Sequence, residues 1–157
     1  MKKLLLAFLT SLTLSGSALA TEFQVGADFV VPYRVDSPKG RLGMLAGGHM
    51  QAYISDALTA DFTALYGVED SGFADRPWYL IPGITAYLPT YVVQPYISGN
   101  LPILANNGQD IGLQAAAGIQ FGLSQGIAVR YSVDAAYYFD SEAYIVNWVH
   151  AGLAVKF

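Results

Sequence analysis

The sequence of 157 residues contains no cysteine, which excludes a disulfide framework and any thiolate metal site. Charged residues are also scarce: Asp, Glu, Lys and Arg make up 13% of the chain, against about a quarter in an average soluble domain. Lys and Arg together number eight, and Asp and Glu together number twelve. An acidic chain lacks the positive surface that nucleic acid requires, so we expect no nucleic-acid partner.

Long apolar runs are missing as well, although 54% of the residues are apolar. A membrane-spanning helix needs about twenty consecutive apolar residues, whereas the apolar stretch Leu4–Leu14 is shorter and is interrupted by Thr and Ser. The composition therefore fits neither a typical soluble domain nor a helical membrane protein. A closed β-barrel remains, because its outward apolar residues occupy only every second position of each strand.

Residues 1–20 have the features of a cleavable export signal. Lys2 and Lys3 precede the apolar stretch, and Ala18, Leu19 and Ala20 form a small-residue cleavage motif. We expect a signal peptide over 1–20 and one barrel domain over 21–157; a retained anchor is the alternative. Removing residues 1–20 takes away two of the eight basic residues and none of the twelve acidic ones, which leaves a net charge of −6.

Alternation of apolar and polar residues predicts the strands. It is clearest over 127–139, where the odd positions are apolar and the even positions are polar or small; the segment 111–123 repeats it. In the last segment we expect one set of residues to face outward: Ile145, Val149, Ala151, Leu153, Val155 and Phe157. We expect the other set to face inward: Val146, Trp148, His150, Gly152, Ala154 and Lys156.

Five further segments complete an eight-stranded, antiparallel, up-and-down transmembrane β-barrel of the all-β class: 23–31, 43–54, 60–67, 78–88 and 92–101. Pro82 and Pro95 fall inside the last two of these. Because proline cannot donate to a sheet ladder, we expect a bulge or a bend at each.

The predicted connections alternate in length, as in bacterial outer-membrane barrels with both termini on the periplasmic side. The longer ones are 32–41, 68–76, 104–110 and 140–143, and the shorter ones are 55–59, 89–90 and 124–126. Gly126 is available for a positive φ in the last of these turns.

The predicted strands contain few charged residues, and all of them share the face that also holds most of the glycines. They are Asp28, Asp61, Arg130, Asp134 and Lys156. That face is too polar for a dry core, and the other face is almost entirely apolar. We therefore expect lipid outside and a lumen plugged by side chains, since eight strands enclose just enough space for side chains to fill. A soluble periplasmic ligand-binding barrel with inverted faces and a narrow-pore channel are the alternatives.

The signal peptide, the eight alternating strands and the ending Val149, Ala151, Leu153, Val155, Phe157 together resemble the small outer-membrane proteins of the OmpA and OmpX type. The resemblance implies the outer membrane of a Gram-negative-type bacterium, contact with membrane lipid and lipopolysaccharide, and recognition of these C-terminal residues by the outer-membrane assembly machinery. Adhesins of this type carry longer external loops. We expect a monomer with a structural or interaction role.

Five inward polar residues form a candidate lumen network: Asp28, His49, Arg130, Asp134 and His150. We expect Asp134 across from His150 or Trp148, and Arg130 opposite Gln120. Closure of the first strand against the last brings Asp28 near them, with His49 beside the first strand. Buried charges must pair, so we interpret the network as a salt-bridge plug.

A lipid A-modifying enzyme is the alternative function, by analogy with other eight-stranded barrels. Acyl transfer needs a nucleophilic Ser or an activating His beside a carboxylate. His150 has no Ser two positions later, and the inward Ser98 and Ser132 face away from lipid. We therefore expect no catalytic residue and no cofactor.

The two histidines lack a third convergent ligand, so we expect no metal centre. Glu69, Asp70 and Asp75 are interpreted as a solvated acidic loop, with a divalent-cation site at the lipopolysaccharide level as the alternative.

Overall fold

The computed structural model describes residues 22–35, 43–68, 78–88, 92–106, 108–124 and 126–157. The predicted signal peptide and the acidic loop at 69–75 lie outside these residues. The described segments form nine strands: β1 (Phe23–Arg34), β2 (Leu45–Ser55), β3 (Leu58–Gly67), β4 (Trp78–Tyr87), β5 (Val93–Asn100), β6 (Ile103–Asn106), β7 (Gly108–Ser124), β8 (Ile127–Tyr138) and β9 (Tyr144–Lys156). No helix within the described segments is long and apolar enough to cross a membrane.

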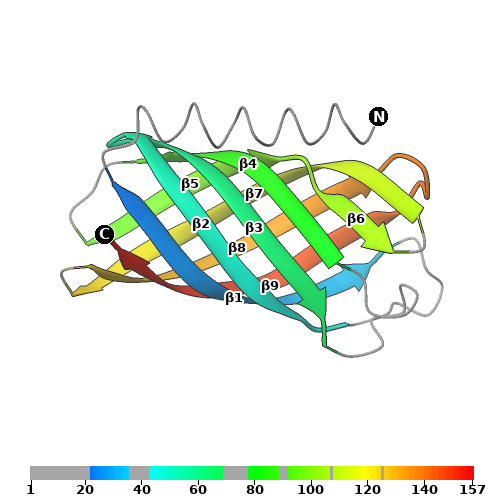
Figure 1. The fold of residues 1–157 in the computed structure, drawn as a ribbon, viewed down its shortest axis with the longest axis horizontal. Helices are drawn as coiled ribbons and strands as arrows, with labels where there is room; N and C mark the ends of the chain where they lie inside the picture. Colours follow the sequence, from blue (N-terminus) through cyan, green and yellow to red (C-terminus); the bar gives the residue numbers. More distant parts are fainter. Residues whose placement is uncertain (1–21, 36–42, 69–77, 89–91, 107, 125) are drawn as a thin grey trace.

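All strand pairs are antiparallel, and the sheet closes on itself because β1 pairs with β9 as well as with β2, and β3 pairs with β4 (Figure 1). β5 and β6 are two parts of one barrel strand, since both pair with β4 on one side and β7 on the other in a single continuous register. The nine strands thus form the predicted eight-stranded up-and-down barrel. Below, the end where β1 begins and β9 finishes is called the terminal end, and the other is called the distal end.

The expected bulges at the two prolines are wrong, although both segments are strands. Pro82 lies in β4, which pairs with β3 without a register shift, and Pro95 lies in β5, opposite Ile119. The carbonyl of Pro82 accepts from the Leu101 amide at 2.9 Å, and that of Pro95 accepts from the Leu88 amide at 2.9 Å. In this register Leu101 is opposite Pro82 and Leu88 is opposite Pro95. The assigned β4–β5 ladder is therefore interrupted at Pro82 and ends at Pro95, where the proline donor is missing, but the register does not shift.

A bulge does occur, at Trp148 on β9. Asn147 is paired with Asp134 and His150 with Ser132, so two residues of β9 oppose one residue of β8. The extra residue inverts the alternation before it. Ile145, expected outside, is buried in the lumen with 2% of its surface exposed, and Trp148, expected inside, is 59% exposed on the outer face. The expectation was wrong for both residues. Because Ile, Val and Trp are all apolar, the sequence of this segment does not show that the bulge exchanges the inward and outward positions.

The predicted loop at 104–110 is also wrong, since β6 extends to Asn106 and β7 begins at Gly108. Polar residues at this end of β7 are typical of a loop in sequence, yet they belong to the sheet. The carboxylate of Asp110 accepts hydrogen bonds from the amides of Asp140 (3.0 Å) and Ser141 (3.1 Å). Asp110 therefore connects the strand to the β8–β9 turn. Gly126, in the β7–β8 turn, has the expected positive φ, at 92°.

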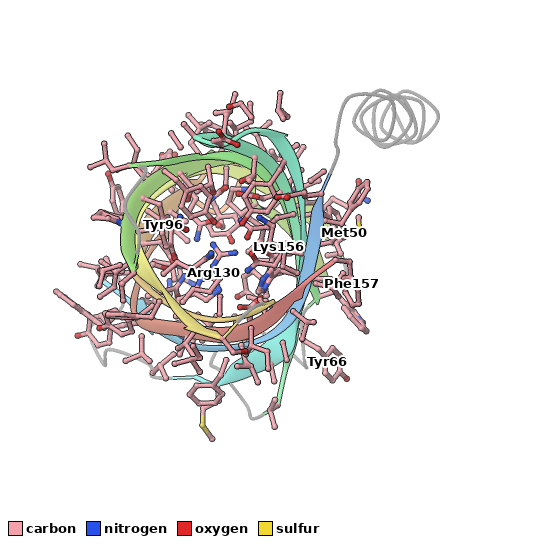
Figure 2. The ribbon with its side chains drawn as sticks, turned by 90° about the vertical axis from the view of Figure 1, so that its left-hand side faces the viewer. Met50, Tyr66, Tyr96, Arg130, Lys156 and Phe157 are labelled. Atoms are coloured by element: carbon pink, nitrogen blue, oxygen red, sulfur yellow. The ribbon has the colours of Figure 1, made fainter. Side chains whose placement is uncertain are left out.

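The two faces of the barrel differ as predicted. Large apolar side chains are exposed all around the outside, including Met50, Ile97, Leu113, Val133 and Leu153. Figure 2 shows Met50, Tyr66 and Phe157 pointing away from the barrel, and Tyr96, Arg130 and Lys156 pointing into it. Polar side chains are buried inside, among them Gln24, Asp28, Gln51 and Asp134.

Candidate functional site in the barrel lumen

The distal end of the lumen is filled by an apolar layer. Its residues sit at the distal ends of six strands and in the turn before β9: Val30, Leu45, Leu65, Tyr79, Ile81, Ala136, Tyr138, Ala143 and Ile145. All of them are buried and they form one contact cluster, with Leu104 of β6 packed against it. Apolar packing of this kind excludes water, so the lumen is closed on the distal side.

A layer of histidines and carboxylates lies next to the apolar layer, toward the terminal end. His49 on β2 holds Asp28 on β1, with 2.7 Å between Nδ1 and Oδ2. His150 on β9 lies between two carboxylates: its Nε2 is 3.5 Å from Asp28 Oδ1, and its Nδ1 is 3.2 Å from Asp134 Oδ2. His49, Asp28, His150 and Asp134 thus form a row of contacts along the inner face of four neighbouring strands, β2, β1, β9 and β8.

His150 lies between two buried carboxylates. Its Nδ1 is within hydrogen-bond distance of Asp134 Oδ2, and because a carboxylate oxygen can only accept a hydrogen bond, the ring nitrogen is the donor. The contact between its Nε2 and Asp28 Oδ1 is longer, at 3.5 Å. The ring therefore links two carboxylates that need partners because they are buried.

Neutral donors complete the coordination of Asp134. The Gln114 side-chain amide donates to Oδ1 at 2.5 Å, and the Asn147 amide donates to the same oxygen. Asn147 points inward only because of the bulge at Trp148. Sequence reasoning missed it, since the regular alternation placed Asn147 on the outer face.

Two glycines provide the space for this layer. A Cβ at Gly152 would approach Asp28 Oδ1 to 2.3 Å, and a Cβ at Gly26 would approach His49 Cε1 to 2.4 Å. Neither position can carry a side chain unless a buried charged group moves. The inward glycines of the sequence are therefore part of the site, because they determine how closely the strands and the ionic side chains approach.

Arg130 lies closer to the terminal end than the histidines. Its pairing opposite Gln120 agrees with the sequence prediction. The guanidinium packs over the ring of Tyr96, with 5.1 Å from Cζ to the centroid. Arg130, Asp134 and His150 line a central cavity of about 20 Å³, which is enough for one water molecule.

A second carboxylate site centres on Asp61 of β3. It accepts from Gln51 at 2.8 Å and from Thr59 at 2.7 Å, and the Thr85 hydroxyl also donates to it. Sequence reasoning placed Asp61 on the inner face but did not include it in the network. The inward threonines of neighbouring strands were the signal that could have shown it.

The chemistry available in the lumen is charge pairing rather than an exposed reactive group. Ser132 is directly opposite His150 and is buried. Among the described residues, no group of three or more His, Asp or Glu side chains is arranged to hold a metal ion. At the C-terminus, Leu153, Val155 and Phe157 are exposed on the outer face, and Val149 and Ala151 are half-buried.

No protein-family model matches the sequence, and no curated protein matches it. Solved structures do match. The N-terminal β-barrel domain of OprF from Pseudomonas aeruginosa is 12% identical with a TM-score of 0.63, over 85% of this chain and 97% of that one. Neisserial surface protein A is 18% identical with a TM-score of 0.62, over 86% and 97%.

Ail, the attachment invasion locus protein of Yersinia pestis, is 11% identical with a TM-score of 0.57, over 87% of this chain and 98% of that one. At these identities the likeness concerns the fold alone. The fold of this chain is that of the small eight-stranded outer-membrane β-barrels, as its resemblance to the OmpA and OmpX type implied.

Proposed function

We propose that the protein is a monomeric integral barrel of the outer membrane of a Gram-negative-type bacterium. In this proposal its lumen is closed, and it acts through its rims and outer surface, in envelope integrity or in contact with lipopolysaccharide or a partner. The exposed apolar surface is the observation that carries the proposal. Large apolar side chains such as Ile97, Leu113 and Phe157 project outward around the barrel, and a soluble monomer rarely exposes a continuous surface of this kind.

The same observation argues against a soluble periplasmic carrier, which would need an apolar interior and a charged exterior. Here the interior holds Asp28, Asp134 and Arg130 beside its apolar layer, and the outer face exposes large apolar side chains instead of charged ones. The resemblance of the fold to outer-membrane proteins supports the same location.

A conducting pore is disfavoured by the apolar layer at the distal end, where Leu45, Leu65 and Tyr79 are almost fully buried. Ions would have to cross this layer without water, and a charge without a partner in an apolar medium is strongly unfavourable.

An enzymatic role is disfavoured by access. Ser132, His150 and Asp134 include the residue types of a nucleophile, a base and an acid, but they lie inside the closed barrel. An acyl chain in the surrounding lipid cannot reach Ser132 without opening the sheet. We therefore expect the mass of lipid A to be the same in cells with and without the protein; a protein-dependent mass change would contradict the non-enzymatic role.

Folding into lipid vesicles tests the proposal. Ile97 is 66% exposed on the outer face. A lysine on the lipid-facing surface of a barrel costs up to about 2–4 kcal/mol, depending on its depth in the bilayer. Ile97→Lys should therefore reduce the fraction that folds into vesicles, whereas Ile97→Met should fold like the unchanged chain. If both variants fold equally well and remain soluble without lipid, the membrane location is wrong.

A further inference from the structure

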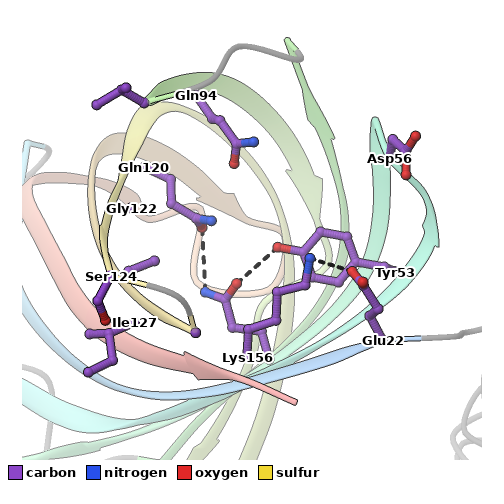
Figure 3. A pocket seen from close by; sticks show the side chains of 13 residues that line it. Glu22, Tyr53, Asp56, Gln94, Gln120, Gly122, Ser124, Ile127 and Lys156 are labelled. Atoms are coloured by element: carbon purple, nitrogen blue, oxygen red, sulfur yellow. Dashed lines mark hydrogen bonds and ion pairs between the residues drawn. The ribbon is translucent and has the colours of Figure 1, made fainter.

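The terminal end of the barrel opens into a pocket of about 520 Å³ that is separate from the histidine layer (Figure 3). Its volume lies within the range of about 300–1,000 Å³ that is usual for small-molecule sites. Figure 3 shows Tyr53, Gln94, Gln120 and Lys156 converging on it from different strands of the barrel. The pocket is therefore an organised cup rather than a gap between loops.

The floor of the cup is made of carboxamides held in place by hydrogen bonds. Gln24 and Gln120 are 1% and 5% exposed. Gln24 donates to Gln120 at 3.4 Å and accepts from the Tyr53 hydroxyl at 2.9 Å. Each carboxamide offers both a donor and an acceptor, so the floor is complementary to groups that also carry both, such as peptide bonds.

The rim carries charges of both signs. Lys156 forms an ion pair with Glu22, and its ammonium lies 4.7 Å from the ring centroid of Tyr53. Asp56, in the β2–β3 turn, adds a second carboxylate. The side chains of Lys156 and Glu22 are both nearly half exposed. An exposed ion pair contributes little to stability, so a ligand can replace it at small cost.

One wall of the cup, formed by the β7–β8 hairpin, consists mostly of small residues. Gly122, Ser124, Gly126 and Ala128 line it together with Ile127, and a Cβ built at Gly122 would meet nothing within 4 Å. This wall therefore leaves room for the side chains of a ligand.

We propose that the cup binds a short zwitterionic peptide. Its carboxylate would pair with Lys156, its ammonium with Glu22 and Asp56, and its peptide groups with the carboxamide floor. A simple anion would meet the two carboxylates of the rim, and a simple cation would meet Lys156. A neutral sugar would leave the charges of the rim unused.

Titration of the purified barrel in detergent micelles with trialanine tests this, with the side-chain amide NMR signals of Gln24 and Gln120 as the readout. We expect saturable shifts of these signals. Trialanine that is acetylated and amidated at its ends should bind at least about tenfold more weakly, because it lacks both charges.

Gly122→Phe should abolish binding by filling the cup. The matched control is Gly99→Phe: Gly99 faces outward on β5 and also has nothing within 4 Å of its Cβ position, so this variant should bind normally. Lys156→Gln is a second test that does not fill the cup. It should weaken the binding of trialanine about tenfold and leave unchanged the binding of trialanine amide, which has no carboxylate.

Three results would overturn the proposal: no saturable shift with trialanine, shifts with maltotriose instead of trialanine, or equal binding by Gly122→Phe and the unchanged barrel. Because the assay is done in micelles, its failure would leave the proposed membrane role untouched.

Discussion

At the scale of single residues, His150 shows how the lumen holds charge away from water. Its two ring nitrogens face Asp28 and Asp134, and each of these carboxylates has a second partner, His49 or Gln114. Replacing His150 removes a side chain that contacts both buried carboxylates. The loss of one member of a buried charge pair typically costs about 3–5 kcal/mol.

We therefore expect His150→Gln to lower the free energy of unfolding by about 3 kcal/mol, measured by urea unfolding of the barrel in detergent. The matched comparison is a double-mutant cycle with Asp134→Asn. Because the second substitution removes the carboxylate that the first leaves unpaired, the double variant should lose less than the sum of the two single variants. Strict additivity would mean that His150 and Asp134 are not coupled.

Tyr131 faces outward, but its hydroxyl also forms a hydrogen bond with the backbone of the bulge. Its hydroxyl donates to the carbonyl of Trp148 at 2.9 Å, the residue at which β9 bulges. In lipid, a carbonyl released from the ladder has no water to bind, and this hydroxyl takes the place of water.

Tyr131→Phe should therefore lower the free energy of unfolding in lipid by about 1–2 kcal/mol. Tyr137→Phe removes a hydroxyl from the outer face of the same strand, away from the bulge, and should have a smaller effect. Urea titrations in vesicles compare the two. Equal losses would show that the Tyr131 hydroxyl does not satisfy the bulge.

At the scale of elements, the alternation in the sequence located the strands, because lipid selects apolar residues at every second position and the lumen does not. This signal does not determine register. A bulge shifts the alternation by one residue, and in the segment Ile145, Val146, Asn147, Trp148 either register places apolar residues on both faces. The sequence therefore predicted His150 and Asp134 on the inner face but not Asn147 beside them.

At the prolines, by contrast, the sequence predicted an irregularity that the strand register does not show. Pro82 and Pro95 indicate a disturbed ladder in sequence, yet β4 and β5 stay in register. Whether a missing donor matters depends on the neighbouring strand, which the sequence around the proline does not specify. The interruption between β5 and β6, at Leu101 and Pro102, is directly opposite Ile81 and Pro82, and the register is the same on both sides of it.

The bulge itself is testable by deletion. Removing Trp148 should restore a regular strand and keep Asn147 and His150 inside, so the barrel should still fold. Removing Ala151, three residues away, would move every residue on one side of the deletion to the opposite face, and we expect that variant to fail. The readout is the faster mobility of a folded barrel on an unboiled gel. Failure of both deletions, or survival of both, would contradict the assigned register.

At the scale of the whole molecule, the lumen has two different ends. The distal end is closed by apolar side chains, and the terminal end opens into the cup. The sequence predicted a filled lumen from the width of an eight-stranded barrel. It could not predict that the filling divides into apolar, ionic and carboxamide layers, because this depends on the stagger between strands.

The closed distal end predicts silence in planar-bilayer recordings of the unchanged barrel. Replacing Leu65 and Tyr79 together by Ser removes the largest apolar side chains of two neighbouring strands in this layer and should admit water. We expect this variant to give small conductance steps. The control Leu113→Ser changes an outward residue and should remain silent. Conductance by the unchanged barrel would contradict the closed lumen.

The central claim is that this chain is a closed barrel embedded in the outer membrane. The measurement that tests it most directly is gel mobility in SDS of the protein in the outer-membrane fraction, loaded with and without boiling. A barrel without free strand edges resists unfolding by cold SDS, so we predict a faster band before boiling and a slower one after it. Recovery of the protein in the soluble periplasmic fraction, with one mobility under both conditions, would contradict the account.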